Sequence, residues 1–124
     1  MIAVSETNFN ITLSRLDQLL QEDQEDEYGA ARPTHYAYAW AKDLLCRVES
    51  LLQGTVLRAS VATDTEGGVH FYWKSSGREV QLALPSQEAG ACYIYRRWEG
   101  DSDIQTEVTA QVLATALGWL CVGV

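Results

Sequence analysis

Histidine and cysteine, which bind transition metals and often act in catalysis, are few in this 124-residue chain. The two histidines, His35 and His70, lie far apart in the sequence. The cysteines include no pair at the short spacing that zinc sites use; they stand at Cys46, Cys92 and Cys121. The sequence therefore predicts neither a metal site nor any other bound cofactor.

The sequence motifs of catalysis are also missing. The sequence contains neither GxSxG, which presents a nucleophilic serine, nor the GxGxxG and P-loop patterns that bind nucleotides. The acidic run at 22–27 does not match a calcium-binding loop, because the sixth position counted from Asp23 is Tyr28 and such loops need glycine there. We therefore expect a protein that is not an enzyme and has no catalytic residue.

The charge of the chain argues against binding to nucleic acid. The sequence has 9 Lys and Arg residues and 17 Asp and Glu residues, which give a formal net charge of −8. Residues 1–62 hold 5 basic and 9 acidic groups, and residues 63–124 hold 4 and 8. Neither half therefore has the cluster of cations that displaces counterions from phosphates.

Membrane insertion and secretion are not expected either. No apolar run approaches the roughly 18–20 residues that cross a bilayer, and the N-terminus lacks a basic region followed by an apolar stretch. An odd number of widely spaced cysteines does not indicate a disulfide framework. These features favour a cytoplasmic protein.

Two helices are predicted in the N-terminal part of the chain. Apolar residues at positions 9, 13, 16 and 20 share one side of a helix. Four residues could cap its start, namely Ser5, Asn8, Asn10 and Thr12. The second helix is predicted to begin after the cap Thr34 and to end near Gln53, with Gly54 as its stop. Its predicted apolar face consists of Ala37, Tyr38, Ala41, Leu44, Leu45, Val48, Leu51 and Leu52.

The pattern after Thr55 changes to the alternation that is typical of strands. It predicts four strands, at 57–61, 69–74, 79–84 and 91–98, with turns at 63–68 and 75–77. Residues 99–103 are predicted to form a polar loop. Thr106 or Thr109 could cap a last helix, whose apolar stripe includes Leu113 and Leu117.

These elements predict a single α+β domain over residues 1–124. Strands joined by short turns pair antiparallel, because parallel neighbours need long crossovers. The predicted architecture has two N-terminal helices, a four-stranded antiparallel meander and a C-terminal helix. The helices are expected to cover one face of the sheet.

Short motifs also occur in a fixed order along the chain: Tyr28-Gly29-Ala30 ahead of Pro33-Thr34, Gly67-Gly68-Val69 ahead of Trp73, Tyr93-Ile94-Tyr95, and Gly118-Trp119-Leu120. In this order they resemble a family of small, uncharacterised bacterial proteins with a Tyr-Gly-Ala…Pro segment, a Gly-Gly-Val/Ile…Trp hairpin and a C-terminal Trp-Leu. The resemblance runs from about Glu27 to Leu120, although Asp26-Glu27 stand where that family often has Trp-Asp. Some members of that family are encoded near toxin–antitoxin genes, and the resemblance implies no catalytic residue.

The strand alternation also predicts which aromatic residues face away from the helices. If Val69, Phe71 and Trp73 face the helices, the opposite face carries Tyr72, Tyr93, Tyr95 and Arg97. Tyrosine and arginine are enriched where proteins dock, so these four residues are the predicted partner-binding residues. The alternative is a half-solvated sheet on which tyrosine, a good strand former, merely covers its neighbours. Stacking of RNA on these rings is disfavoured, because the basic surround is missing.

We therefore expect a non-catalytic protein–protein interaction module, with a second copy of the chain as a possible partner in a homodimer. One alternative is an antitoxin or inhibitor whose acidic surface, above all 22–27, occupies a basic site on a toxin or nuclease. Another is a domain that binds a small ligand between the helices and the sheet, in a pocket lined by Trp40, Trp73 and Trp119.

Overall fold

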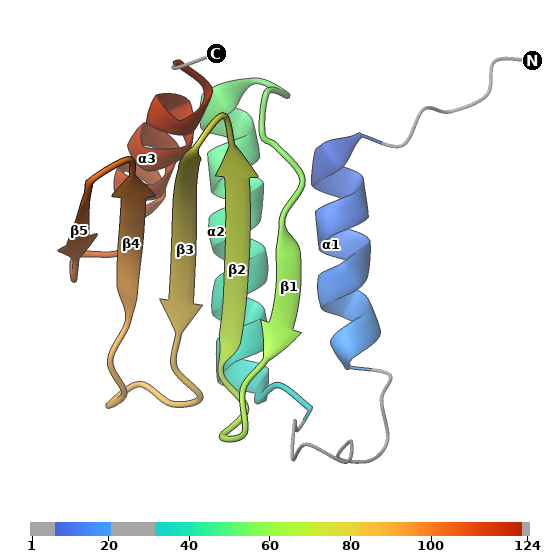
Figure 1. The fold of residues 1–124 in the computed structure, drawn as a ribbon. Helices are drawn as coiled ribbons and strands as arrows, with labels where there is room; N and C mark the ends of the chain where they lie inside the picture. The colour runs from blue at the N-terminus through green and yellow to red at the C-terminus, as the bar shows by residue number, and fades with distance from the viewer. Residues whose placement is uncertain (1–6, 21–31, 123–124) are drawn as a thin grey trace, which may run out of the picture.

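A computed structural model of the chain describes residues 7–20 and 32–122. These residues form an α+β fold with three helices and one antiparallel sheet of five strands (Figure 1). The elements, in chain order, are α1 (Asn8–Leu19), α2 (His35–Leu52), β1 (Ser60–Thr63), β2 (Val69–Ser75), β3 (Arg78–Leu84), β4 (Tyr93–Trp98), β5 (Asp101–Gln105) and α3 (Ala110–Val122).

The sheet is the predicted antiparallel meander, with its strands in the order β1-β2-β3-β4-β5. The prediction of four strands was wrong, because part of the expected polar loop forms β5 and pairs with β4. Glu99 and Gly100 make the turn between these two strands, and Gly100 has the positive φ of 81° that glycine adopts without strain. This strand has no apolar alternation, because most of its residues are exposed to solvent on both faces of the sheet.

The predicted cap residues are correct at two of the three described helices. Thr34 caps α2 by accepting a hydrogen bond from the backbone of Ala37, and Gln53 ends this helix in the left-handed conformation. Thr109 caps α3, which selects one of its two predicted caps. At α1 the prediction was wrong, because the cap is Thr7, whose side chain accepts from the backbone N–H of Asn10.

The core lies between the sheet and the helices. The inward residues of the strands include Val69, Phe71 and Trp73, as predicted, and all three are buried. Of the predicted apolar face of α2, Tyr38 and Leu52 are partly buried and Leu51 is 49% exposed, whereas the other members are buried. Leu51 borders a hollow beside α3 that is lined in part by Gln111 and Ala114.

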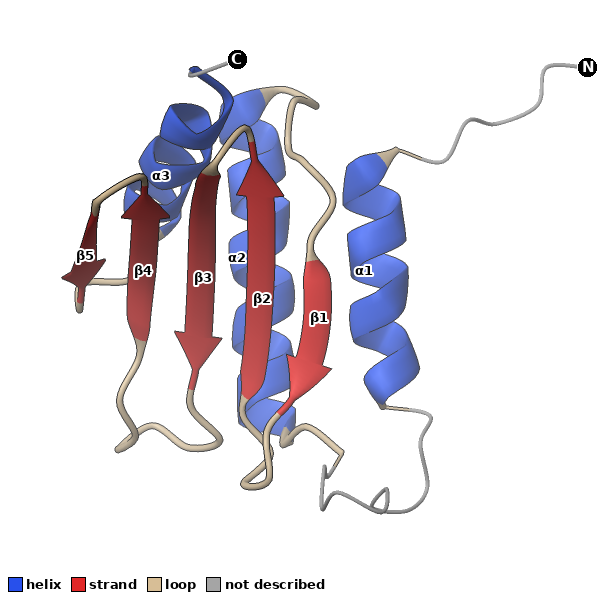
Figure 2. Cartoon of the chain, in the orientation of Figure 1, coloured by secondary structure: helices blue, strands red, loops and turns tan. Residues whose placement is uncertain are grey.

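The helices are distributed unevenly around the sheet. Figure 2 shows α2 and α3 behind the sheet and α1 beside β1. The opposite face of the sheet, turned toward the viewer, has no helix of the described residues over it. None of the described helices is long and apolar enough to cross a membrane.

Candidate functional site

The uncovered face of the sheet, called here the outer face, carries the predicted tyrosines in two neighbouring rows. Tyr72 pairs with Gln81, and Gln81 pairs with Tyr95, so both tyrosines flank Gln81 in one row. In the next row Ala83 lies between His70 and Tyr93. Residues directly opposite on paired strands share a face, and all three tyrosines are half-buried.

The orientation of β4 is as predicted. Ile94 is fully buried toward the helices, which leaves Tyr93 and Tyr95 on the outer face. The structure thus brings three of the four predicted residues together across three strands.

The fourth predicted residue, Arg97, joins them through Glu79. Arg97 Nη1 lies 3.9 Å from Glu79 Oε2. A hydrogen bond between the Tyr72 hydroxyl and Glu79, together with burial, raises the pKa of Tyr72 above its usual value. Glu79 therefore links Tyr72 to Arg97. This linking role follows from the strand register, which pairs Glu79 with Arg97.

Ile104 extends the row of Tyr72, Gln81 and Tyr95 onto β5, since it pairs with Tyr95. Ile104 is 57% exposed, which is more than Tyr36 and Leu51, the other large apolar residues that are exposed in the described part of the chain. Ile104 was not predicted as a surface residue, because residues 99–103 directly before it were expected to form a loop and Ile104 itself was assigned to no element. The glycine at position 100, directly after Trp98-Glu99, is the signal of a hairpin turn that could have revealed it.

The outer face is less acidic than the chain as a whole. Its strand residues include two cations, Lys74 and Arg97, and one anion, Glu79. The whole chain, by contrast, has a formal net charge of −8. A second protein can therefore approach this face with less electrostatic repulsion than the composition suggests.

One end of the outer face borders a hollow of about 270 Å³, lined in part by His70, Tyr93 and Asp64. Asp64 Oδ1 accepts hydrogen bonds from the backbone N–H groups of Glu66 and Gly68, both at 2.9 Å. Asp64 Oδ2 lies 2.9 Å from His70 Nε2. Burial raises the pKa of the Asp64 carboxyl, but these hydrogen bonds outweigh burial and lower it overall. Both carboxylate oxygens are thus occupied in holding the β1–β2 turn.

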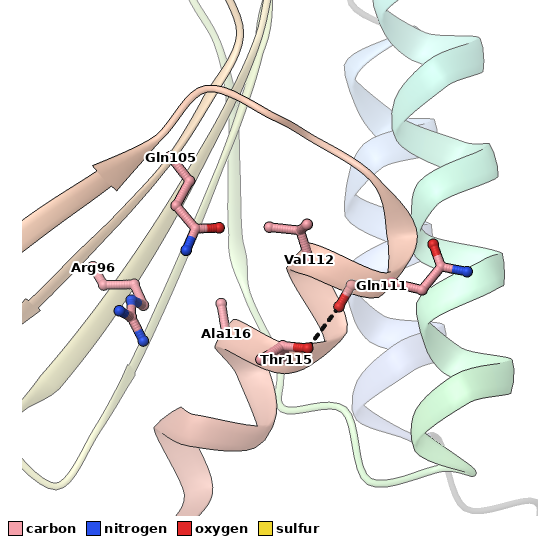
Figure 3. A pocket seen from close by; sticks show the side chains of 6 residues that line it. All are labelled: Arg96, Gln105, Gln111, Val112, Thr115 and Ala116. Carbon is pink, nitrogen blue, oxygen red and sulfur yellow. Dashed lines mark hydrogen bonds between the residues drawn. The ribbon is translucent and has the colours of Figure 1, made fainter.

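A second hollow, called here the α3 groove, lies between the inner side of β4 and β5 and helix α3 (Figure 3). It measures about 230 Å³ and is lined by Arg96, Gln105, Gln111, Val112, Thr115 and Ala116. Arg96 and Gln105 reach toward α3 from the strands, and Val112 and Ala116 form the apolar side opposite them.

The guanidinium of Arg96 is held on two sides. Its Nε donates to Asp103 Oδ1 at 2.9 Å, and its Nη2 donates to the other carboxylate oxygen of Asp103. Its central carbon lies 4.9 Å from the centre of the Trp119 ring, within the range of a cation–π interaction. Arg96 is therefore fixed and neutralised rather than an isolated cation facing the groove.

The tryptophans predicted to line a ligand pocket are not gathered around this groove. Trp73 is fully buried, and its Nε1 donates to the carbonyl of Leu57 at 3.0 Å. Trp40 packs edge-on against Tyr36, whereas Trp119 contacts Arg78 and Arg96. Neither Trp40, Trp73 nor Trp119 is among the residues that line the α3 groove.

Within the described ranges, no cluster of His, Cys, Asp and Glu is arranged to hold a metal ion. Cys46 is exposed and Cys92 is partly buried. The acidic run at 22–27, on which the prediction of an inhibitor rests, lies outside the described residues.

Comparison with known proteins adds no relative to this picture. No family model matches the chain, and searches of curated proteins and of solved structures also find no match.

Proposed function

We propose that the protein is a non-catalytic protein–protein interaction module and that its outer face binds a second copy of the chain. The observation that carries the proposal is the row formed by Tyr72, Gln81, Tyr95 and Ile104 on a face that none of the described helices covers. Aromatic rings with polar tips suit a surface that is wet in the monomer and buried in a dimer.

The two ends of the outer face differ in charge in a way that favours a symmetric dimer. Lys74 and Arg97 lie at one end, where Glu79 and Glu99 balance them, whereas Asp64 and Glu66 make the other end, beside His70, acidic. A two-fold axis that lies in the interface and crosses the strands would place the Lys74 end of one copy against the Asp64 end of the other. The tyrosine row would then lie near the axis, where the two copies contact each other with the same residues.

The test is sedimentation velocity over a range of concentrations, with the double variant Tyr72→Ala/Tyr95→Ala. We expect the wild-type chain to form a dimer and the variant to dissociate at least about tenfold more readily, because large aromatic anchors dominate interface energies. Tyr36→Ala is the matched control, since it removes an exposed tyrosine from α2, away from the outer face.

Thermal unfolding of each variant separates lost association from lost folding. A wild-type chain that remains monomeric at every concentration would overturn the proposal. So would a folded double variant that dimerises as well as the wild type.

A further inference from the structure

The outer edge of β5 is the open end of the sheet's hydrogen-bond ladder. Among the described residues, β4 is the only element that packs extensively against β5. Four of the five strand residues are exposed, and Figure 1 shows this strand at the border of the molecule. A strand at an open edge presents backbone donors and acceptors to which another extended chain can pair.

The α3 groove opens beside this edge. Gln105 is the residue of β5 that lines it, and Val112 and Ala116 supply its apolar wall. Successive side chains of a strand point to opposite faces, so a strand added beside β5 would direct alternate side chains toward this groove. The remaining side chains would lie beside Ile104 on the outer face.

The charge around the edge decides which kind of segment fits. Residues 99–107 include four acids and no lysine or arginine. Asp103 is paired with Arg96, whereas Glu99, Asp101 and Glu107 are exposed and form no ion pair within the part of the chain that the structure describes. These carboxylates repel an identical edge from a second copy and attract a basic segment.

We propose that the edge of β5 binds an extended, basic segment of a partner protein as a sixth strand of the sheet. Its backbone pairs with β5, an apolar side chain enters the α3 groove, and Lys or Arg residues on either side lie near Asp101 and Glu107. This site adjoins the tyrosine row at Ile104, but its existence does not depend on dimer formation.

The probe is a blocked peptide of the sequence Lys-Arg-Val-Thr-Val-Arg-Lys, titrated against the full chain by fluorescence anisotropy. We expect saturable binding that weakens as salt is raised, because salt screens exposed charges. The peptide Glu-Glu-Val-Thr-Val-Glu-Glu should not bind. Equal binding of both peptides, or binding of neither, would overturn the proposal.

The charge requirement is tested with Asp101→Lys/Glu107→Lys, which we expect to weaken binding about tenfold. The matched control is Glu66→Lys/Glu88→Lys, which changes the net charge equally but alters exposed acids away from β5. We expect this control to retain nearly all of the affinity. An equal loss in both variants would indicate attraction by net charge alone and would overturn the site.

Strand pairing is tested with two N-methylated peptides, each blocking alternate backbone N–H groups. Only one of the two alternating sets faces β5 in an added strand. We therefore expect one methylated peptide to lose binding and the other to keep it. If both methylated peptides keep their binding, or if both lose it equally, the proposed strand pairing is wrong. Tyr72→Ala/Tyr95→Ala should bind the peptide normally, so this proposal and that of the dimer can fail separately.

Discussion

The two edge strands of the sheet, β1 and β5, are both short, but they differ in whether another element covers their open side. At the β1 edge, helix α1 takes the place of a further strand. Thr12 Oγ1 accepts a hydrogen bond from the backbone N–H of Ala59 at 3.0 Å, and Arg15 donates to the Ala59 carbonyl at 3.4 Å. Side chains of a helix thus bond to the backbone beside β1, and Thr12 is itself almost completely buried.

At the β5 edge, no described element provides such partners. The strand is bordered by acids, carries the exposed Ile104, and opens onto the α3 groove. A helix that covers a sheet edge contributes to the stability of the fold. An open edge can bind another strand, but charged residues are needed to prevent pairing with the wrong chain. The contrast teaches that α1 should matter for stability and β5 for recognition.

The largest expected effect comes from loosening α1. Leu16 is fully buried and anchors α1 in the core. Leu16→Ala should lower the free energy of unfolding by about 2–5 kcal/mol, through lost burial and the cavity left behind. It should also speed hydrogen exchange at the Ala59 amide, because detaching α1 uncovers this edge.

Urea denaturation and hydrogen-exchange NMR measure these two effects. Leu51→Ala, which truncates a half-exposed leucine of α2, is the control and should cost much less. If both variants lose the same stability, α1 does not have the role that the comparison gives it.

A smaller effect is expected when a single hydrogen bond at the covered edge is removed. Thr12→Val keeps the shape of the side chain but leaves the Ala59 N–H without its acceptor in a buried position. We expect a loss of about 1–3 kcal/mol in unfolding free energy. Thr115→Val is the matched control, because that hydroxyl bonds only to the Gln111 carbonyl at an exposed site of α3. A Thr12→Val chain as stable as this control would remove the main support for edge capping by α1.

The smallest expected effect is on the pH dependence of stability, and it is tested at one aspartate near each edge of the sheet. Hydrogen bonds lower the pKa of Asp64 in spite of its burial, and the hydrogen bond from Arg96 lowers that of Asp103. A carboxyl whose folded pKa is depressed stabilises the fold above its unfolded pKa of about 3.9, and this contribution is lost as the pH falls through the folded value.

Asp64→Asn and Asp103→Asn should therefore each flatten the fall in stability below about pH 4. Urea denaturation measured as a function of pH follows this change. Both carboxylates are partly exposed, so we expect each effect to be modest. A profile as steep as that of the wild type in both variants would show that these aspartates do not govern acid sensitivity.

The parts of the fold that could be predicted are those that bury one side. Val69, Phe71 and Trp73 alternate with polar neighbours because one face of β2 packs on helices. The start and end of α2 were predictable because Thr34 and Gly54 act through local backbone geometry. The orientation of the tyrosines followed from the same alternation.

The parts that could not be predicted depend on neighbours distant in the sequence. Thr12 was considered as a helix cap, but it bonds to Ala59, 47 positions away. Arg96 occupies an inward position of β4, where the pairing with Asp103 and the contact with the Trp119 ring of α3 make a charged side chain acceptable. The exposure of Leu51 likewise depends on how α3 packs beside the end of α2.

By itself, the sequence determined the α+β class, the antiparallel meander and the inward side of its longer strands, because burial of one side imposes a period that can be read directly. Only the tertiary structure decided that residues 101–105 form a strand, that one edge is covered by α1 and that the other is open. An exposed strand leaves no hydrophobic pattern, and the partners of an edge are set by the packing of elements far apart along the chain.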